Sequence, residues 1–259
     1  MTNNYQHIKR SYRSEDIAQT YDTKRFRLSP RKQLLNRLFL NALTGIINVI
    51  KSNGMSDPPG HPVGEPPRNN RDSTHAPRIL DIPCGTGRTF KTLVNKGIDL
   101  IGADISMEMM KVSDLPLRDF HHMGIPLGME KIGLVQCDAE RMPFKNKSFD
   151  VILCLRFLTL RVPAEARKMI FREMKRVSRK WVIIECRQRN FWSNIWYWWA
   201  ETFQNNPRFN YFTRDEIKKE LEKAGIDLVR TFTPFGMFSN KWLLLGRVYP
   251  DEGRVKDTK

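Results

Sequence analysis

The stretch RILDIPCGTGRTF, residues 78–90, decides the fold of this 259-residue chain. The segment Arg78–Asp81 predicts a short buried strand that ends in a carboxylate. Two glycines, Gly85 and Gly87, follow it, and after them the pattern becomes that of a helix. Because glycine lets a backbone come close to a bound molecule, this strand, turn and helix predict a small-molecule site at the turn.

Strand-like and helix-like segments alternate along the rest of the chain. Further strands are predicted at Ile98–Asp104, Ile132–Cys137, Phe149–Leu155, Lys180–Cys186, Ile226–Thr233 and Trp242–Val248. Helices are predicted from Pro30 to Ile50, at Arg88–Lys96, from the N-cap residue Ser106, at Pro163–Val177, and from the capping box Thr213–Glu216 to Gly225. This alternation favours an α/β fold with a mostly parallel sheet and helices on both faces.

Changes in composition divide the chain into a core and its additions. The predicted parts are a basic segment and helix over 1–51 that cover the bound molecule, a flexible loop over 52–77, an α/β core over 78–249 with an aromatic lid segment over 191–212, and a tail over 250–259. The loop is rich in Pro, Gly and Asn and has almost nothing to bury, so no packed structure is expected for it.

The chain is strongly basic, with a net charge of +16 and a pI near 9.9. Such a charge favours acidic partners: nucleic acid, an anionic membrane surface, or a substrate that carries phosphate or carboxylate. The four cysteines form no CxxC pair and the five histidines complete no zinc pattern, so no metal site is predicted. There is no apolar core of a secretory signal and no run of the roughly 18 to 20 apolar residues that span a membrane. We therefore expect a cytoplasmic protein.

Carboxylates follow the first three strands of the predicted sheet. Asp81, Asp104 and Asp138 each stand where a strand ends, and α/β sheets bind ligands beyond the carboxyl ends of their strands. The turn lacks the third glycine of a dinucleotide fingerprint and the GK[ST] of a phosphate-binding loop. A carboxylate just before the glycines matches a cationic group better than a pyrophosphate. Asp104 can accept hydrogen bonds from ribose hydroxyls, and Asp138 can accept one from the exocyclic amine of a base.

The motifs LDIPCGTGR, GADIS and CDAERMPFKNKSFDVILC, with the two terminal strands, resemble those of class I S-adenosylmethionine-dependent methyltransferases. The chain is most similar to the type-11 group, which includes the ubiquinone and menaquinone C-methyltransferases. The resemblance covers roughly residues 78–248 and the helix before them. It implies a Rossmann-like, seven-stranded, mostly parallel sheet with an antiparallel last strand, S-adenosyl-L-methionine as the cofactor, and methyl transfer as the activity.

The resemblance also assigns residues to the cofactor. In chain order they are Tyr21, Asp81, Pro83, Cys84, Gly85, Gly87, Asp104, Ile105, Asp138 and Ala139. Asp81 and the glycines of the first turn would contact the methionine part of the cofactor. Asp104, after the second strand, would bind the ribose, and Asp138 and Ala139, after the third strand, would bind the adenine. The tyrosine belongs to a YD pair near the N-terminus that would close over the cofactor.

Fewer motifs indicate which residues bind the acceptor, the molecule that receives the methyl group. After the fourth strand the chain reads LRFLTL, where many relatives have a histidine or other polar residues, so no catalytic base is carried over. Arg156 and Tyr21 are the substrate-side candidates, because an arginine fork matches a carboxylate or phosphate. A surface or helix-capping role is the alternative for Arg156 and for Arg161. The adjacent His121 and His122 are interpreted as solvated loop residues.

The segment FWSNIWYWWAETF, residues 191–203, has the most unusual local composition in the chain. One interpretation is an amphipathic helix that roofs the substrate pocket and touches an anionic membrane, where tryptophan and tyrosine favour the interface. The other is a helix whose aromatic side chains pack against the sheet. The basic charge of the chain favours peripheral membrane contact.

Three functions are compatible with these features. The leading hypothesis is methyl transfer to a small acceptor that is lipophilic or anionic. The second is an RNA or nucleic-acid methyltransferase, suggested by the charge; against it, the chain reads CLRF where amino-group base methyltransferases carry a [DNS]PP[YFW] tetrad. The third is a non-catalytic scaffold that retained the fold, which the intact acids and glycines argue against. The acceptor atom and the oligomeric state stay open.

Overall fold

The computed structural model describes residues 2–22, 29–52, 77–94, 98–113, 132–160, 162–189, 209–234 and 240–249. Several predictions on sequence features lie outside these ranges: nearly all of the 52–77 loop, the histidines His121 and His122, Arg161, the aromatic segment 191–203 and the 250–259 tail. The domain boundaries proposed from composition therefore stay predictions.

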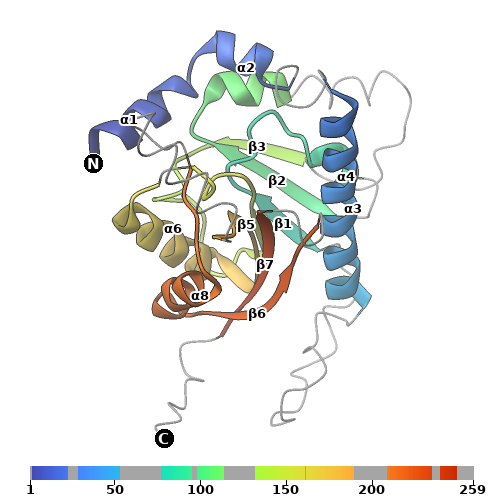
Figure 1. The fold of residues 1–259 in the computed structure, drawn as a ribbon, viewed down its shortest axis with the longest axis vertical. Coiled ribbons are helices and arrows are strands. Elements are labelled where there is room, and N and C mark those ends of the chain that lie inside the picture. The colour runs from blue at the N-terminus through green and yellow to red at the C-terminus, as the bar shows by residue number, and fades with distance from the viewer. Residues whose placement is uncertain are drawn as a thin grey trace, which may run out of the picture.

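Seven strands form one sheet in the order β3-β2-β1-β4-β5-β7-β6 (Figure 1). Their bounds are β1 Arg78–Asp81, β2 Asp99–Asp104, β3 Ile132–Gln136, β4 Phe149–Cys154, β5 Ser178–Arg187, β6 Ile226–Phe232 and β7 Lys241–Val248. The pairs among β1 to β5 are parallel, whereas β7 runs antiparallel to both β5 and β6. The predicted seven-stranded, mostly parallel sheet with an antiparallel last strand is confirmed.

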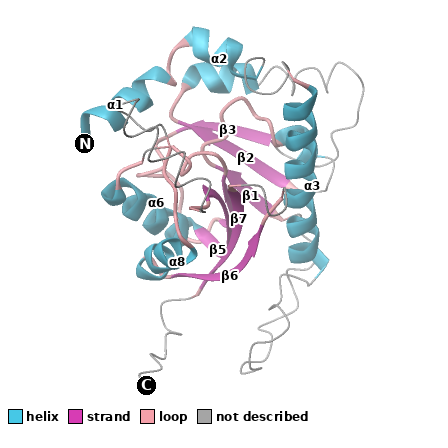
Figure 2. Ribbon diagram, viewed as in Figure 1, coloured by secondary structure: helices cyan, strands magenta, loops and turns pink. Residues whose placement is uncertain are grey.

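Helices cover both faces of the sheet (Figure 2). Their bounds are α1 Thr2–Ser11, α2 Glu15–Asp22, α3 Pro30–Ser52, α4 Phe90–Val94, α6 Ala164–Val177 and α8 Arg214–Lys223, and residues 107–113 are also helical. The helices α3 and α4 pack on one face, and α6 and α8 pack on the other. Because both faces are covered, a strand such as β5 is apolar almost throughout instead of alternating.

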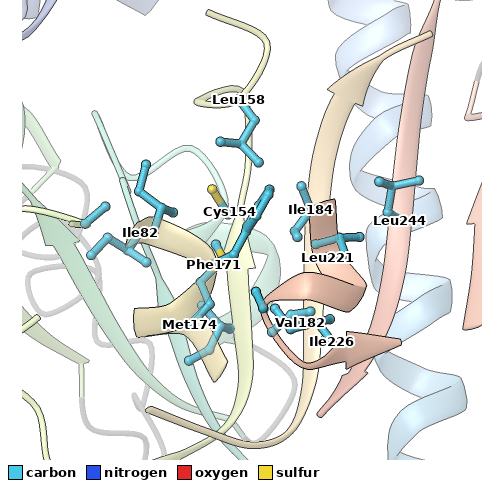
Figure 3. Packing of buried hydrophobic residues seen from close by; sticks show 14 of the residues in the cluster. Ile82, Cys154, Leu158, Phe171, Met174, Val182, Ile184, Leu221, Ile226 and Leu244 are labelled. Carbon is cyan, nitrogen blue, oxygen red and sulfur yellow. The ribbon is translucent and has the colours of Figure 1, made fainter. Parts of the chain in front are cut away.

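Two apolar cores result, one on each side of the sheet. Figure 3 shows the larger one, where Phe171 and Met174 of α6 and Leu221 of α8 meet Val182 and Ile184 of β5. The intervening strand residue Ile183 points to the opposite core, between the sheet and α3. The period-two alternation of a strand thus divides β5 between the two layers.

The helices α1 and α2 were not predicted, because residues 1–30 are polar and show little apolar periodicity. They contain few apolar side chains, of which Tyr5 and Ala18 are buried, Tyr5 in the core cluster against the sheet. Polar contacts also attach α1: Tyr5 Oη donates to Glu140 Oε1 at 3.0 Å, and Lys9 Nζ lies 2.7 Å from Asp138 Oδ2. The next residues are attached by Ser106 Oγ, which donates to the carbonyl oxygen of Tyr12 at 2.7 Å.

Within the described ranges one segment, Lys32–Lys51 of α3, is long and apolar enough to cross a membrane by length and mean hydropathy alone. This corrects the prediction that no such segment exists, which counted unbroken apolar runs and so passed over a helix with scattered polar residues. In the structure its apolar stripe has another partner, because Phe39, Leu43 and Ile47 are buried against the sheet. The rest of the helix is more exposed: 28% of the apolar window is buried, and Leu34, Leu38 and Val49 are exposed.

The predicted capping box at the start of α8 is confirmed. Glu216 N–H donates to Thr213 Oγ1 at 3.2 Å, and Thr213 N–H donates to Glu216 Oε2 at 2.8 Å. The helix ends at Lys223, and Gly225 follows two residues later, as predicted.

We expect Thr213→Ala to lower the free energy of unfolding by about 1 kcal/mol, because it removes the acceptor for one N-terminal N–H of α8. Urea unfolding followed by circular dichroism measures this change. Thr20→Ala is the control: Thr20 is a partly exposed threonine inside α2, so its replacement should change stability by less than about 0.5 kcal/mol. Equal losses in the two variants would contradict a capping role.

Candidate functional site

A cavity lies where the strand order reverses, beyond the carboxyl ends of β2, β1 and β4. It contains about 820 Å³ of empty space, counting the part open to solvent. Most of the predicted site residues line it: Tyr21, Asp81, Pro83, Cys84, Gly85, Asp104, Ile105 and Arg156. Gly87, Asp138 and Ala139 are not among the lining residues.

Asp81 ends β1 with a buried carboxylate that faces the cavity. Its Oδ2 accepts a hydrogen bond from Thr89 Oγ1. Among the described residues its other oxygen, Oδ1, is buried and has no hydrogen-bond partner. Burial raises the pKa of Asp81 to about 7, although the bond from Thr89 and the charge of Arg88 oppose the rise. A cationic donor next to Oδ1 would satisfy this oxygen and stabilise the ionised form.

The two glycines of the turn have different surroundings. Both have positive φ, +56° at Gly85 and +68° at Gly87. A Cβ at Gly85 would meet nothing within 4 Å, whereas a Cβ at Gly87 would lie 2.8 Å from the ring of Phe90 and 2.9 Å from Ser113 Cβ. Gly85 therefore keeps the cavity wall open, and Gly87 lets the turn pack against the helices behind it.

Asp104 ends β2 and holds the turn in place. Its Oδ2 accepts from Gly85 N–H at 2.8 Å, and its Oδ1 accepts from Ser106 N–H at 2.9 Å. Ser106 in turn caps the helix over residues 107–113 by accepting from Met109 N–H at 3.1 Å, which confirms the predicted N-cap. Burial raises the pKa of Asp104, and the backbone N–H donors oppose the rise. Each carboxylate oxygen still has a lone pair for a ligand hydroxyl.

Asp138 lies beside the cavity and is joined to it through α1. Lys9 lines the cavity and its ammonium lies 2.7 Å from Asp138 Oδ2, with Glu140 as a second partner. Asp138 Oδ1 accepts from Glu140 N–H at 3.1 Å. Hydrogen bonds to both acids raise the pKa of Lys9 against the effect of burial, which lowers it. Lys9 was missed from the sequence, because a single lysine in a basic segment gives no local signal.

Basic and aromatic side chains also line the cavity. Arg156 follows β4 with φ +62°, a left-handed conformation that a non-glycine residue adopts at an energetic cost. Its guanidinium carbon lies 5.9 Å from the ring centroid of Tyr21. Arg88, which no sequence motif singled out, also lines the cavity and donates from Nη1 to Asn36 Oδ1 of α3 at 2.8 Å.

The described residues do not form a metal-binding site. Across the ranges that the structure describes, no group of three His, Cys, Asp or Glu side chains is placed to hold a metal ion. The cavity lining combines the carboxylates of Asp81 and Asp104, the guanidinium groups of Arg88 and Arg156, and apolar side chains.

The chain is similar to known proteins in sequence and in structure. Residues 79–180 match the family model described as a methyltransferase domain. The ubiquinone/menaquinone biosynthesis C-methyltransferase UbiE of Stutzerimonas stutzeri is 38% identical over 81 residues, which are 30% of this chain and 29% of that protein. The uncharacterized protein MJ1252 of Methanocaldococcus jannaschii is 39% identical over 72 residues, 28% of this chain and 22% of that protein. The match thus spans less than a third of each of these relatives.

Two solved structures show the same fold. Magnesium protoporphyrin IX methyltransferase (ChlM) of Synechocystis with bound SAH has a TM-score of 0.70 at 13% identity, and covers 95% of this chain and 100% of its own. An S-adenosylmethionine-dependent methyltransferase of Methanosarcina mazei has a TM-score of 0.56 at 19% identity, and covers 68% of this chain and 93% of its own. The Rossmann-like class of the sheet is confirmed by these likenesses.

We expect the two glycines of the turn to differ in what they contribute to stability. Gly85→Ala should cost about 1–2 kcal/mol, because alanine is strained at positive φ but has room there. Gly87→Ala should cost a further 1–3 kcal/mol or so, because its Cβ also overlaps Phe90 and Ser113. Urea unfolding of both variants measures the difference, and equal losses would contradict the distinction.

Proposed function

Because the chain carries a class I S-adenosylmethionine-dependent methyltransferase domain, we propose that it binds S-adenosyl-L-methionine and transfers its methyl group to a small acceptor that is lipophilic or anionic. The observation that carries this proposal is Asp81 Oδ1, which has no hydrogen-bond partner among the described residues and lies beside the open wall at Gly85. A buried carboxylate oxygen with no donor fits the α-ammonium group of the cofactor. No phosphate would fit there, because two negative charges would then face each other.

The other cofactor contacts follow from the same positions. Asp104 would accept the ribose hydroxyls with Ile105 beside it, and Asp138 and Ala139 would border the adenine. The bound cofactor supplies a methyl group already activated on a sulfonium. The residues of the chain have to hold both reactants in line and exclude water, which is catalysis by proximity and orientation. Leu155, with Phe157 and Leu160, provides apolar walls for this purpose.

The names of the similar proteins support a small acceptor. UbiE is named as a C-methyltransferase of ubiquinone and menaquinone biosynthesis, and ChlM as a methyltransferase of magnesium protoporphyrin IX. Arg156 and Tyr21 are the residues that we propose to face the acceptor. Methyl transfer to nucleic acid is the alternative, and only the net charge of +16 favours it. Failure to bind the cofactor would instead indicate a scaffold without activity.

We expect S-adenosylhomocysteine to bind the protein about tenfold more tightly at pH 8 than at pH 6. The reason is the pKa of Asp81, about 7: the carboxyl is mostly protonated at pH 6 and mostly ionised at pH 8, and only the ionised form pairs with an ammonium. Isothermal titration calorimetry measures the affinity across this range. Asp81→Asn should weaken binding at pH 8 and remove the pH dependence.

Asp99→Asn is the matched control, because Asp99 pairs with Arg78 at the opposite end of the strands and does not line the cavity. The affinity of the Asp99→Asn variant for S-adenosylhomocysteine should equal that of the unmodified protein at every pH. If no S-adenosylhomocysteine binds at all, the proposed function is wrong. If it binds with the same affinity to Asp81→Asn, only the role of Asp81 is wrong.

We also propose that the protein is a cytoplasmic enzyme that touches an anionic membrane through residues 191–203. We expect the protein to float with vesicles of phosphatidylglycerol, but not with vesicles of phosphatidylcholine, and to bind a single-stranded RNA only weakly. Flotation measures the binding to vesicles, and filter binding over a series of salt concentrations measures the binding to RNA. Tight RNA binding whose affinity falls steeply with salt would instead favour the nucleic-acid alternative.

A further inference from the structure

The helix α1 reaches the two acids that follow β3 through two of its side chains. Tyr5 Oη donates to Glu140 Oε1 at 3.0 Å. Lys9 Nζ donates to Asp138 Oδ2 at 2.7 Å and also pairs with Glu140. These contacts join parts of the chain that are 129 to 135 residues apart. One lysine of α1 therefore binds both acids.

Lys9 connects these acids with the cavity. It is one of the residues that line the cavity, whereas Asp138 and Glu140 are not among them. Its side chain is 12% exposed, and its ammonium nitrogen lies 4.9 Å from the ring centroid of Tyr5. A lysine side chain loses much rotamer freedom when it is fixed, and here two carboxylates and a ring hold it. The ammonium group thus has a defined position beside the cavity.

The carboxylate of Asp138 is held at both of its oxygen atoms. Oδ2 accepts from Lys9, and Oδ1 accepts from the N–H of Glu140 at 3.1 Å. A carboxylate oxygen has two lone pairs, so each oxygen can still accept a hydrogen bond from a ligand. The side chain is 34% exposed, which leaves access for such a bond. Loss of the lysine would release Oδ2 and leave only one contact to orient the group.

Asp138 lies next to Asp104 at the carboxyl edge of the sheet. The parallel register pairs Asp104 of β2 with Gln136 of β3. Cys137 N–H donates to the carbonyl oxygen of Asp104 at 3.0 Å, and Asp138 is the next residue. The proposed function assigns the ribose to Asp104 and the base to Asp138. The two positions are adjacent, as the ribose and the base of one nucleoside require.

We propose that Lys9 is a positioning residue, which holds the carboxylate of Asp138 in the orientation that accepts the exocyclic amine of adenine. The inference rests on the proposed function and goes beyond it, because it makes α1 part of the recognition of the base. A carboxylate can only accept hydrogen bonds. A base with a carbonyl oxygen in place of the amine would bring one acceptor against another, and binding would be weaker.

The test compares S-adenosylhomocysteine with S-inosylhomocysteine, in which a carbonyl oxygen replaces the exocyclic amine. We expect the unmodified protein to bind the adenine compound about a hundredfold or more tightly than the inosine compound, as measured by calorimetry. Lys9→Met should reduce this ratio of affinities about tenfold, the effect of losing a charge-assisted hydrogen bond. The ratio does not depend on how much of the variant is folded, because only folded protein contributes to either affinity.

Three further variants show whether Lys9 acts through Asp138. Lys9→Arg keeps the positive charge and should retain part of the ratio. Asp138→Asn should lower the ratio, and adding Lys9→Met to it should lower the ratio no further, because the two residues act as a unit. Lys111→Met is the matched control, since it removes an exposed lysine that pairs with Glu108 and does not line the cavity. Its ratio should equal that of the unmodified protein.

Three results would overturn the inference. The first is similar affinity of the unmodified protein for the two compounds. The second is an unchanged ratio in Lys9→Met, even if both compounds bind more weakly, because Lys9 would then only attach α1. The third is full additivity of Lys9→Met and Asp138→Asn. Failure of the unmodified protein to bind either compound would instead overturn the proposed function.

Discussion

The hydrogen bond from Gly85 N–H to Asp104 Oδ2, at 2.8 Å, joins the turn after β1 to the end of β2. The parallel register pairs Asp81 with Gly102, so Asp104 extends two residues beyond that pair and reaches the turn. Its second oxygen accepts from Ser106 N–H and thereby fixes the start of the next helix. The shape of the turn, the direction of that helix and the open wall at Gly85 all depend on this one buried carboxylate.

Charged side chains of both signs lie at the carboxyl edge of the sheet. Acids stand on the β1 and β2 side, where Asp81 and Asp104 are buried and their pKa values are raised by burial. Bases stand on the β4, β5 and β7 side, where the cations around Glu185 keep its pKa low despite complete burial.

Most of the fold could be predicted from local patterns. All seven strands and the capping box of α8 follow from the period of apolar residues and from side chains three positions apart. The helices α1 and α2 could not be predicted in this way, because Tyr5 and Lys9 bind Glu140 and Asp138 across more than a hundred residues of chain. For α3 the sequence predicted a helix with one apolar face, and the structure supplied the sheet as the partner of that face.

The sequence by itself determined the strand, the glycine turn and the carboxylates at the strand ends, because each depends on residues that are neighbours in the chain. Only the tertiary structure distinguished Gly85 from Gly87, since one faces the cavity and the other faces Phe90 and Ser113. Only the antiparallel pairing of β5 with β7 brought Arg187 and Lys241 together. Packing and electrostatic interactions act between groups that are close in space, and which groups become close is decided when the chain folds.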